Sequence, residues 1–243
     1  MSNILILGAT SDIAVATARK FAAEKHDIQL AGRNIENLLP LKTDLNVRFG
    51  VNTDVFKFDA SDFKSHKPFY SGLPKKPDVV ICVFGYMVEE EIAGDNWEEA
   101  EKMINVNFTG AASILNIIAK DFEEKGNGVI VGISSVAGER GRQSKLFYGS
   151  AKAGFSTFLD GLRNRTASKG VHVLSVKPGF VYTKMTSELD LPGILTAKPE
   201  QVGKAIYNGV QKRKNTIYVK WMWKWIMLII KSIPEPLFKK MNL

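Results

Sequence analysis

Tyr148 and Lys152 are the two residues whose types and spacing point most directly to acid–base chemistry. They are four residues apart in a stretch with helical periodicity, so their side chains share one face of the expected helix. A tyrosine with its ordinary pKa of about 10 is a weak acid at neutral pH, and a nearby ammonium favours the phenolate and lowers that pKa toward the working range. The pair therefore indicates proton transfer at Tyr148, although a Tyr-x-x-x-Lys pair alone also occurs on ordinary exposed helices.

Short apolar segments rich in β-branched residues alternate with longer helical ones, which predicts an α/β fold. The expected strands are residues 4–7, 28–31, 55–58, 79–83, 129–133, 171–176 and 217–219, and the expected helices lie near 13–25, 35–45, 97–124, 148–169 and 199–212. We expect a single-domain, Rossmann-like, doubly wound parallel sheet of about seven strands with helices on both faces, whose ligand lies beyond the carboxyl ends of the strands. The catalytic domain is expected over residues 1–215, followed by a C-terminal segment, 216–243, that holds the last strand and an amphipathic helix.

The 243 residues carry a net charge of +8, and all of the excess lies near the C-terminus. Residues 1–197 hold 23 basic and 23 acidic residues, whereas residues 198–243 hold ten basic residues and two glutamates. A neutral main body argues against nucleic-acid binding, and a basic segment rich in Trp favours an anionic membrane surface.

Cysteine and histidine are too sparse for a disulfide or a metal site. The single Cys82 excludes an internal disulfide and is interpreted as a small buried residue, and no N-terminal signal peptide is recognised, so we expect a reducing, cytoplasmic location. His26, His66 and His172 lack partners at metal-ligand spacing, so no metal is predicted.

Small and polar residues follow the expected strands and are candidates for binding a dinucleotide. The first strand runs through a tight turn into a helix N-terminus, where a pyrophosphate would fit, although a turn with Ser11 or Asp12 as N-cap explains the same residues. Arg33 stands where an arginine suits a 2′-phosphate, which favours NADP(H) and leaves NAD(H) open, since Arg33 could also be a solvated surface residue. The candidate residues are Gly8, Thr10, Ser11, Asp12, Ile13, Arg33, Asp59, Ala60, Phe84 and Gly85.

The surroundings of Tyr148 and Lys152 make the pair specific. Ser134 and Ser135 follow the fifth strand, Asn107 interrupts an apolar helix, and Pro-Gly-Phe-Val-Tyr-Thr at 178–183 follows the sixth strand. In this order and spacing, residues 3–219 resemble the short-chain dehydrogenase/reductase family.

This resemblance implies a role for each matching position. Tyr148 would protonate the substrate carbonyl oxygen, and Lys152 would lower the pKa of Tyr148 and hold the nicotinamide ribose. Ser135 rather than Ser134 would bind the same carbonyl oxygen. Asn107 would support a proton relay. With Tyr148 and Lys152, the residues expected to hold the nicotinamide are Pro178, Gly179, Val181 and Thr183.

Two departures from the family pattern point to a narrower branch. Asp12 and Ala14 replace glycines of the first turn, and Cys82-Val83-Phe84-Gly85 replaces the usual Asn-Asn-Ala-Gly. The chain is similar to family members that reduce a 2-keto sugar on a polyprenyl phosphate carrier, as the reducing half of an epimerase in cell-envelope polysaccharide biosynthesis. That similarity implies an FAD-dependent oxidase partner that supplies the keto-sugar.

The C-terminal segment agrees with a lipid-linked substrate. On a helix over residues 220–232, three lysines gather on one side, and Trp221, Trp223, Trp225 and the aliphatic residues of 226–230 fill the remaining arc. The apolar run is too short to span a bilayer and Pro234 and Pro236 stop the helix, so we expect peripheral attachment to the inner face of the membrane. A homo-oligomer interface is the alternative.

Three further interpretations stay open at this stage. Arg140 and Arg142, between Ser135 and Tyr148, would bind the carrier phosphate, or they are surface charges. The chain could instead be a soluble reductase of another carbonyl, such as a 3-ketoacyl thioester or a steroid. A dinucleotide-binding membrane scaffold without turnover is a third possibility, against which the set of Asn107, Ser135, Tyr148 and Lys152 argues.

Overall fold

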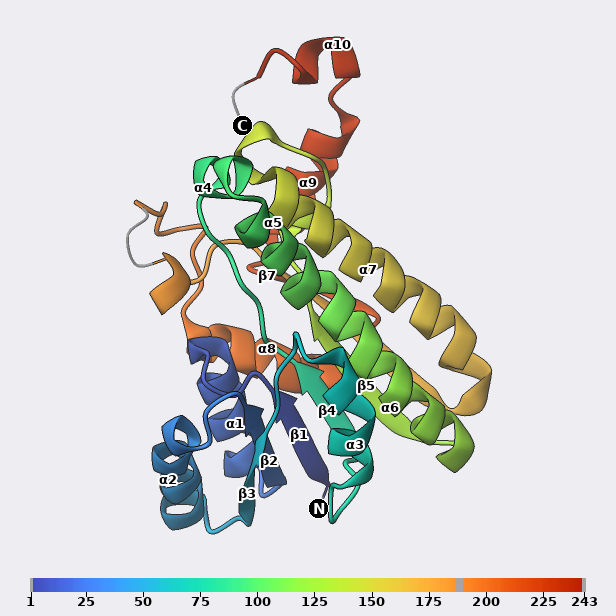
Figure 1. Cartoon of the computed structure of the whole chain (residues 1–243). Coiled ribbons are helices and arrows are strands. Elements are labelled where there is room, and N and C mark those ends of the chain that lie inside the picture. The colour runs from blue at the N-terminus through green and yellow to red at the C-terminus, as the bar shows by residue number, and fades with distance from the viewer. Residues whose placement is uncertain (1, 187–189, 242–243) are drawn as a thin grey trace.

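In a computed structural model that describes residues 2–186 and 190–241, seven parallel strands form one sheet at the centre of the molecule (Figure 1). Their order is β3-β2-β1-β4-β5-β6-β7. The strands are β1 (Asn3–Leu7), β2 (Asp27–Gly32), β3 (Thr53–Lys57), β4 (Val79–Cys82), β5 (Gly128–Ile133), β6 (Val171–Pro178) and β7 (Thr216–Val219). The predicted Rossmann-like, doubly wound parallel sheet is confirmed.

Helices cover both faces of this sheet. One layer consists of α1 (Asp12–Ala23), α2 (Leu39–Phe49) and α8 (Pro199–Gln211), and the other of α3 (His66–Ser71), α6 (Ala111–Lys125) and α7 (Leu146–Thr166). The remaining helices are α4 (Glu90–Asp95), α5 (Trp97–Ile104), α9 (Met222–Ser232) and α10 (Glu235–Phe238).

The central strands β4 and β5 have no polar side chain and β1 has only Asn3, at its first position, because each face of the sheet is buried under helices. In β1, Ile4 and Ile6 point to the core beneath α1 and α8, and Leu5 and Leu7 point to the core beneath α6 and α7; all four are fully buried. Alternate side chains of a strand serve opposite faces, so a strand covered on both sides reads as a continuous hydrophobic run.

The expected helix over residues 97–124 is divided in the structure. A π-helical segment, Asn105–Gly110, separates α5 from α6. Within it the Asn107 amide donates to the carbonyl of Met103 at 2.9 Å, and a Cβ built on Gly110 would lie only 2.1 Å from the carbonyl oxygen of Ala60. The wider turn thus brings the helix backbone against the loop after β3, and single-turn π segments of this kind are frequent at functional sites.

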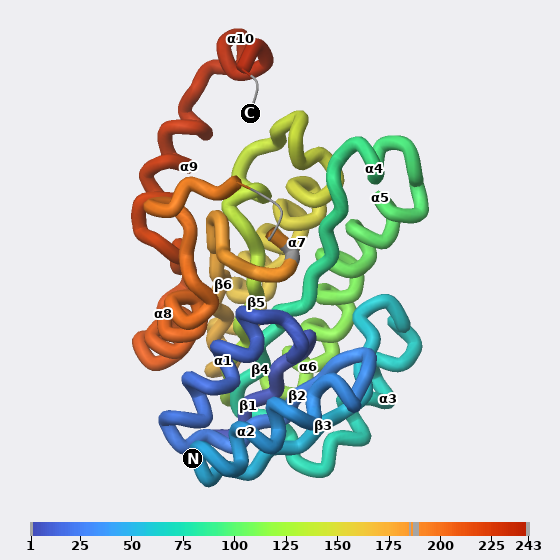
Figure 2. The backbone as a smooth tube through the Cα atoms, turned by 90° about the vertical axis from the view of Figure 1, so that its left-hand side faces the viewer, coloured from blue at the N-terminus to red at the C-terminus, as the bar shows by residue number. Residues whose placement is uncertain are grey.

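The C-terminal segment begins as predicted with a strand, since β7 pairs with β6. The expected helix over 220–232 starts later, at Met222, because Lys220 adopts a left-handed backbone conformation with φ 62°. Pro234 follows the end of α9, but Pro236 lies in the first turn of α10, which stands farthest from the sheet in both views (Figures 1 and 2).

The apolar arc expected on this helix, which includes Trp221 just before α9, is split between two faces. Trp223 and Met227 are buried, with Ile226 and Ile230 packed beside them, whereas a second set faces solvent. That set is Trp221, Trp225, Leu228 and Ile229, which are 71%, 53%, 51% and 66% exposed. In the described residues no helix is both long and apolar enough to span a bilayer.

Gly110→Ala is expected to lower the free energy of unfolding by about 3 kcal/mol, because the new methyl group collides with the Ala60 carbonyl rather than with a movable side chain. Gly161→Ala in α7 is the matched control: a Cβ there meets nothing within 4 Å, so better helix propensity should stabilise the protein by about 0.5 to 1 kcal/mol. Urea denaturation followed by circular dichroism measures both. Equal effects of the two substitutions would contradict the tight contact.

Candidate active site

Two adjoining cavities lie where the order of the strands reverses, between β1 and β4. Their volumes are about 290 Å³ and 150 Å³, and both are lined by Thr10, Ser11, Phe84 and Gly85. The carboxyl ends of strands at such a reversal form the ligand-binding crevice of open α/β sheets. Every residue expected to bind the cofactor lines one of the cavities: Gly8, Thr10, Ser11, Asp12, Ile13, Arg33, Asp59, Ala60, Phe84, Gly85, Tyr148, Lys152, Pro178, Gly179, Val181 and Thr183.

The turn between β1 and α1 is shaped for close backbone approach. Gly8 has φ 88°, and a Cβ on it would lie 2.6 Å from the backbone nitrogen of Phe84, so only glycine fits. Ser11 caps α1 by accepting from the amide of Ala14 at 3.2 Å. The positive end of the α1 dipole therefore faces the cavity, as a pyrophosphate requires.

Asp12, at a position where a glycine is usual, has a structural partner. Its carboxylate accepts a hydrogen bond from the backbone amide of Lys184 at 2.8 Å, across 172 positions of sequence. Asp12 thus ties the first turn of α1 to the segment after β6. This departure from the family pattern joins two walls of the larger cavity.

The lining of the smaller cavity includes a lysine, Lys102, that the sequence did not predict there. Lys102 of α5 lines it together with Arg33, which is exposed at the end of β2. The Lys102 ammonium lies 3.9 Å from the centroid of the Tyr86 ring and 3.5 Å from the Glu99 carboxylate. A mid-helix lysine carries no sequence signal of such a position, because only the packing of α5 over the loop after β4 brings it there.

Lys152 is buried beside Tyr148 on the face of α7 that borders the cavity. Lys152 is only 4% exposed, and its ammonium donates to the carbonyl of Ile133 at 3.1 Å. The same ammonium lies 5.7 Å from the centroid of the Tyr148 ring. The helix therefore brings the pair together as its spacing predicts.

The protonation states of the pair differ from the expectation. Burial raises the pKa of Tyr148 to about 12, although the hydrogen bond with Ser135 lowers it, so the net shift is upward and not toward neutrality. Burial also lowers the pKa of Lys152 to about 8. Loss of solvent thus dominates for both groups, and it keeps Tyr148 a protonated phenol at neutral pH.

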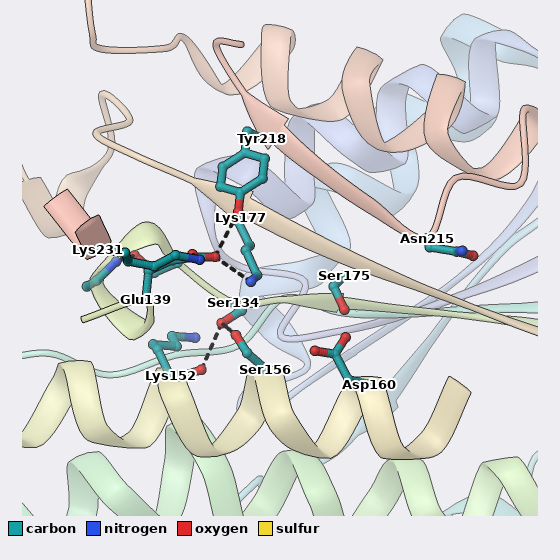
Figure 3. Close-up of polar contacts among 12 residues, drawn as sticks. Ser134, Glu139, Lys152, Ser156, Asp160, Ser175, Lys177, Asn215, Tyr218 and Lys231 are labelled. Carbon is teal, nitrogen blue, oxygen red and sulfur yellow. Dashed lines mark hydrogen bonds and ion pairs between the residues drawn. The ribbon is translucent and has the colours of Figure 1, made fainter. Parts of the chain in front are cut away.

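The two neighbouring serines after β5 have different roles. Ser134 faces α7, where its hydroxyl donates to the Lys152 carbonyl at 2.9 Å and meets the Ser156 hydroxyl at 2.7 Å (Figure 3). Ser135 lines the larger cavity, interacts with Tyr148, and accepts from the amide of Ala137 at 3.1 Å. The structure thus brings the Ser135 hydroxyl to the phenol and turns the Ser134 hydroxyl to α7.

Asn107 lies behind the cavity rather than in its wall. It is 1% exposed, donates to the carbonyl of Tyr86 at 2.5 Å, and accepts from the Tyr86 amide at 3.3 Å. A Cβ built on Gly85 would lie 3.0 Å from the Asn107 oxygen and 3.7 Å from the Lys152 ammonium. Asn107 therefore holds the loop after β4 and approaches Lys152 across Gly85.

The two arginines expected near a substrate phosphate behave differently. Arg140 is engaged by the C-terminal segment: its guanidinium donates to the carbonyls of Ile230 and Ile233 at 2.5 and 2.7 Å, pairs with Glu235 at 3.0 Å, and lies 3.6 Å from the Phe238 ring centroid. Arg140 lines neither of the two cavities, and its contacts cap the end of α9. Arg142 has a buried Nε without a hydrogen-bond partner among the described residues, and burial lowers its pKa.

Cys82 and the histidines are used in packing. Cys82 is buried and burial raises the pKa of its thiol to about 12, which leaves it unreactive. His66 is fully buried, with its ring nitrogens 3.1 Å from the Asp59 carbonyl and 2.9 Å from the Ser113 hydroxyl, and so supports the loop that lines the smaller cavity. Across residues 2–186 and 190–241, no three His, Cys, Asp or Glu side chains are grouped as metal ligands.

A parallel sheet with a phosphate-binding turn and a Tyr-Lys-Ser cluster at its switch point defines a dinucleotide-binding enzyme fold, and comparison with known proteins gives the family. The short chain dehydrogenase family profile matches residues 2–192. An uncharacterized oxidoreductase of Streptomyces coelicolor, encoded in the mprA 5′ region, is 31% identical over 98% of this chain and 95% of its own length. The chain belongs to the short-chain dehydrogenase family and is an NAD(P)-dependent oxidoreductase.

A second sequence relative and two solved structures with the same fold are also similar to this chain. An uncharacterized oxidoreductase of Mycobacterium tuberculosis is 28% identical over 98% of this chain and 96% of its own length. A short-chain dehydrogenase from Sphingobium yanoikuyae, solved in complex with NADPH, superposes with a TM-score of 0.84 at 22% identity, covering 97% of both chains. A 7β-hydroxysteroid dehydrogenase superposes with a TM-score of 0.86 at 21% identity, over 100% of this chain and 97% of its own.

The affinity for a reduced nicotinamide cofactor is expected to fall as the pH rises through about 8. Below this pH the buried Lys152 carries the ammonium that would donate to the nicotinamide ribose, and above it the free enzyme must first take up a proton, so the dissociation constant should rise up to about tenfold per pH unit. Fluorescence titration of NADPH between pH 6.5 and 9.5 measures this.

Lys152→Met is the control for this titration. The variant should bind more weakly at pH 7 and lose the step near pH 8, because the titrating group is gone. A step of the same size in the variant would assign the pH dependence to another group.

Proposed function

We propose that this enzyme reduces a ketone to an alcohol, with Tyr148 as the proton donor. Tyr148 donates its phenolic proton to the carbonyl oxygen, and the Ser135 hydroxyl donates a hydrogen bond to the same oxygen. Lys152 holds the nicotinamide ribose and compensates the negative charge that remains on Tyr148. When bound, the reduced cofactor supplies the hydride.

One observation carries this proposal: the phenol of Tyr148, the hydroxyl of Ser135 and the ammonium of Lys152 converge on a cavity at the reversal of strand order. A phenol with a pKa near 12 is protonated at neutral pH, which is the form that carbonyl reduction consumes. Asn107 is assigned a supporting role, because it fixes the loop that carries Gly85 next to Lys152.

NADPH is the cofactor we favour over NADH. Arg33 follows β2 at the cavity that would hold the adenosine half, and it is exposed there together with Lys102. A guanidinium and an ammonium at this place suit a 2′-phosphate, whereas NADH selection calls for a carboxylate that accepts from the ribose. NADPH in the Sphingobium structure, which has the same fold, supports this choice.

For the substrate we propose a 2-keto sugar on a polyprenyl phosphate carrier. The sequence resembles decaprenylphosphoryl-β-D-erythro-pentofuranosid-2-ulose 2-reductase in the segments around Ser135, Pro178 and the C-terminus. Arg142 remains the candidate for the carrier phosphate, since its half-buried guanidinium includes an Nε without a described partner. In such a pathway of cell-envelope synthesis, a separate FAD-dependent oxidase would produce the ketone.

Peripheral contact with the inner face of the membrane is proposed through the outer face of α9. Trp221, Trp225, Leu228 and Ile229 form an apolar surface there, and Lys224 lies beside it with its ammonium 5.7 Å from the Trp225 ring centroid. Exposed Trp and aliphatic side chains next to lysines match the boundary of an anionic bilayer. Contact of this face with a second copy of the chain is the alternative outcome.

The wild-type enzyme should oxidise NADPH in the presence of a polyprenyl-phosphate 2-keto sugar, and Tyr148→Phe should reduce kcat by a factor on the order of 10³, because the proton donor is lost while the ring remains. Loss of absorbance at 340 nm under anaerobic conditions is the measurement. A panel with a 3-ketoacyl thioester and a ketosteroid, run with NADPH and with NADH, tests the alternatives. Turnover of those ketones alone would reject the sugar substrate, and full activity of Tyr148→Phe would reject the mechanism.

A variant with Trp221, Trp225, Leu228 and Ile229 all replaced by Ser should lose at least tenfold in binding to vesicles of phosphatidylcholine and phosphatidylglycerol, because apolar area no longer enters the bilayer. Trp97→Ser is the matched control, since Trp97 is 66% exposed and belongs to α5, which lies on the opposite side of Figure 2 from α9. Trp223 is left intact because it is buried. Flotation measures binding, and absence of wild-type binding would reject membrane contact, with ultracentrifugation then testing for a dimer.

A further inference from the structure

Glu139 is a buried carboxylate four residues after Ser135, directly after the short 3-10 helix Val136–Gly138. Its side chain is 3% exposed. It accepts hydrogen bonds from the ammonium of Lys177 at 2.5 Å, the ammonium of Lys231 at 2.7 Å and the hydroxyl of Tyr218 at 2.9 Å (Figure 3). One carboxylate therefore joins four separate segments of the chain.

The three partners lie on elements that border or support the cavity. Lys177 is in β6 and immediately precedes Pro178 and Gly179, which line the cavity. Tyr218 is in β7 and Lys231 is in α9. Glu139 consequently links the loop of Ser135 to the segment expected to hold the nicotinamide, and links both to the C-terminal helix.

The other side of the Ser135 loop rests on α7. A Cβ built on Gly138 would lie 2.6 Å from the amide nitrogen of Ala153 and from the carbonyl carbon of Lys152. This backbone contact leaves no room for the loop to move toward α7. The contacts of Glu139 hold it from the opposite side, so the loop that carries Ser135 is fixed between the catalytic helix and β6.

The C-terminal helix supports the same segment through Trp223. A Cβ built on Gly179 would lie 2.0 Å from Cε2 of the Trp223 indole, which therefore lies directly against the glycine backbone. The indole Nε1 donates to the carbonyl of Leu195 at 3.0 Å, and the ring meets Phe180 edge to face at 5.4 Å. The Lys231 ion pair with Glu139 thus helps to keep α9 seated where Trp223 can support Gly179.

We propose that Glu139 is a positioning residue of the reductase site, which fixes Ser135 relative to Pro178 and Gly179 and makes α9 part of the support of the cofactor. This inference rests on the proposed function, because it takes Ser135 as the carbonyl contact and Pro178 and Gly179 as nicotinamide contacts.

The charges of the cluster agree with this role. Burial alone would raise the pKa of Glu139, but the hydrogen bonds from Lys177, Lys231 and Tyr218 and the Lys177 charge outweigh it and hold the pKa at about 2, so the carboxylate is ionised throughout the working range. Lys177 is mostly buried, with 14% of its side chain exposed, whereas Lys231 is 46% exposed. Loss of the Glu139 charge therefore leaves Lys177 as a mostly buried cation without its carboxylate, which is costly, and lets Lys231 turn to solvent.

The experiment compares NADPH affinity with thermal stability in Glu139→Gln, Lys231→Gln and the double variant Glu139→Gln/Lys177→Gln. Glu139→Gln should raise the dissociation constant of NADPH by about tenfold or more and lower the unfolding temperature, since small displacements in a site are costly. Lys231→Gln removes only the partner on α9 and keeps the Lys177 pair, so it should raise the constant by less than Glu139→Gln does, about threefold, because Trp223 still packs against Gly179. The double variant removes the stranded charge, so its unfolding temperature should recover while its NADPH affinity stays low.

Recovery of affinity together with stability in the double variant would overturn the proposal, because the carboxylate would then be only structural. An affinity of Glu139→Gln within about twofold of wild type would also overturn it. If Glu139→Gln does not fold, the double variant, which leaves no unpaired lysine at position 177, is compared with the wild type in its place. Failure of the wild-type protein to bind NADPH or NADH would overturn the proposed function and this inference together. Equal binding of NADPH by the wild type and by Glu139→Gln would overturn the inference alone.

Discussion

The reversal of strand order between β1 and β4 is the constraint on which the rest of this molecule depends. Both strands are buried on both faces, so their side chains cannot contact a ligand across the sheet, and at their carboxyl ends the chain turns away in opposite directions and leaves a crevice. The turn after β1 passes so close to the loop after β4 that Gly8 cannot carry a side chain against Phe84. Everything proposed to contact the cofactor is arranged around this narrow opening.

Much of this arrangement could be predicted from the sequence because it is encoded locally. A strand buried on both faces is apolar throughout, so the strands were found within about two residues of their ends. Tyr148 and Lys152 share a helix face through simple periodicity, and the residues after each strand had to meet at one edge of the sheet. For these reasons all of the expected cofactor residues line the two cavities.

What could not be predicted depends on contacts between distant segments. Lys102 reaches the smaller cavity, Arg140 turns to the end of α9, and the π-helical segment lies where Gly110 meets the backbone of Ala60. The pKa of Tyr148 rises rather than falls because burial outweighs the hydrogen bond with Ser135, a balance that spacing does not reveal. The short helices α3 and α4 also carry too little periodicity to be recognised.

The contact between Trp223 and Gly179 has a consequence for how this enzyme can vary among its relatives. Any residue larger than glycine at position 179 would occupy the space of the indole, so the two positions cannot change independently. A relative with alanine or serine at the position of Gly179 is expected to carry a smaller residue in place of Trp223, or a differently placed C-terminal helix. A chimera that takes its C-terminal segment from a relative should therefore fold only when the residue at position 179 is taken from that relative as well.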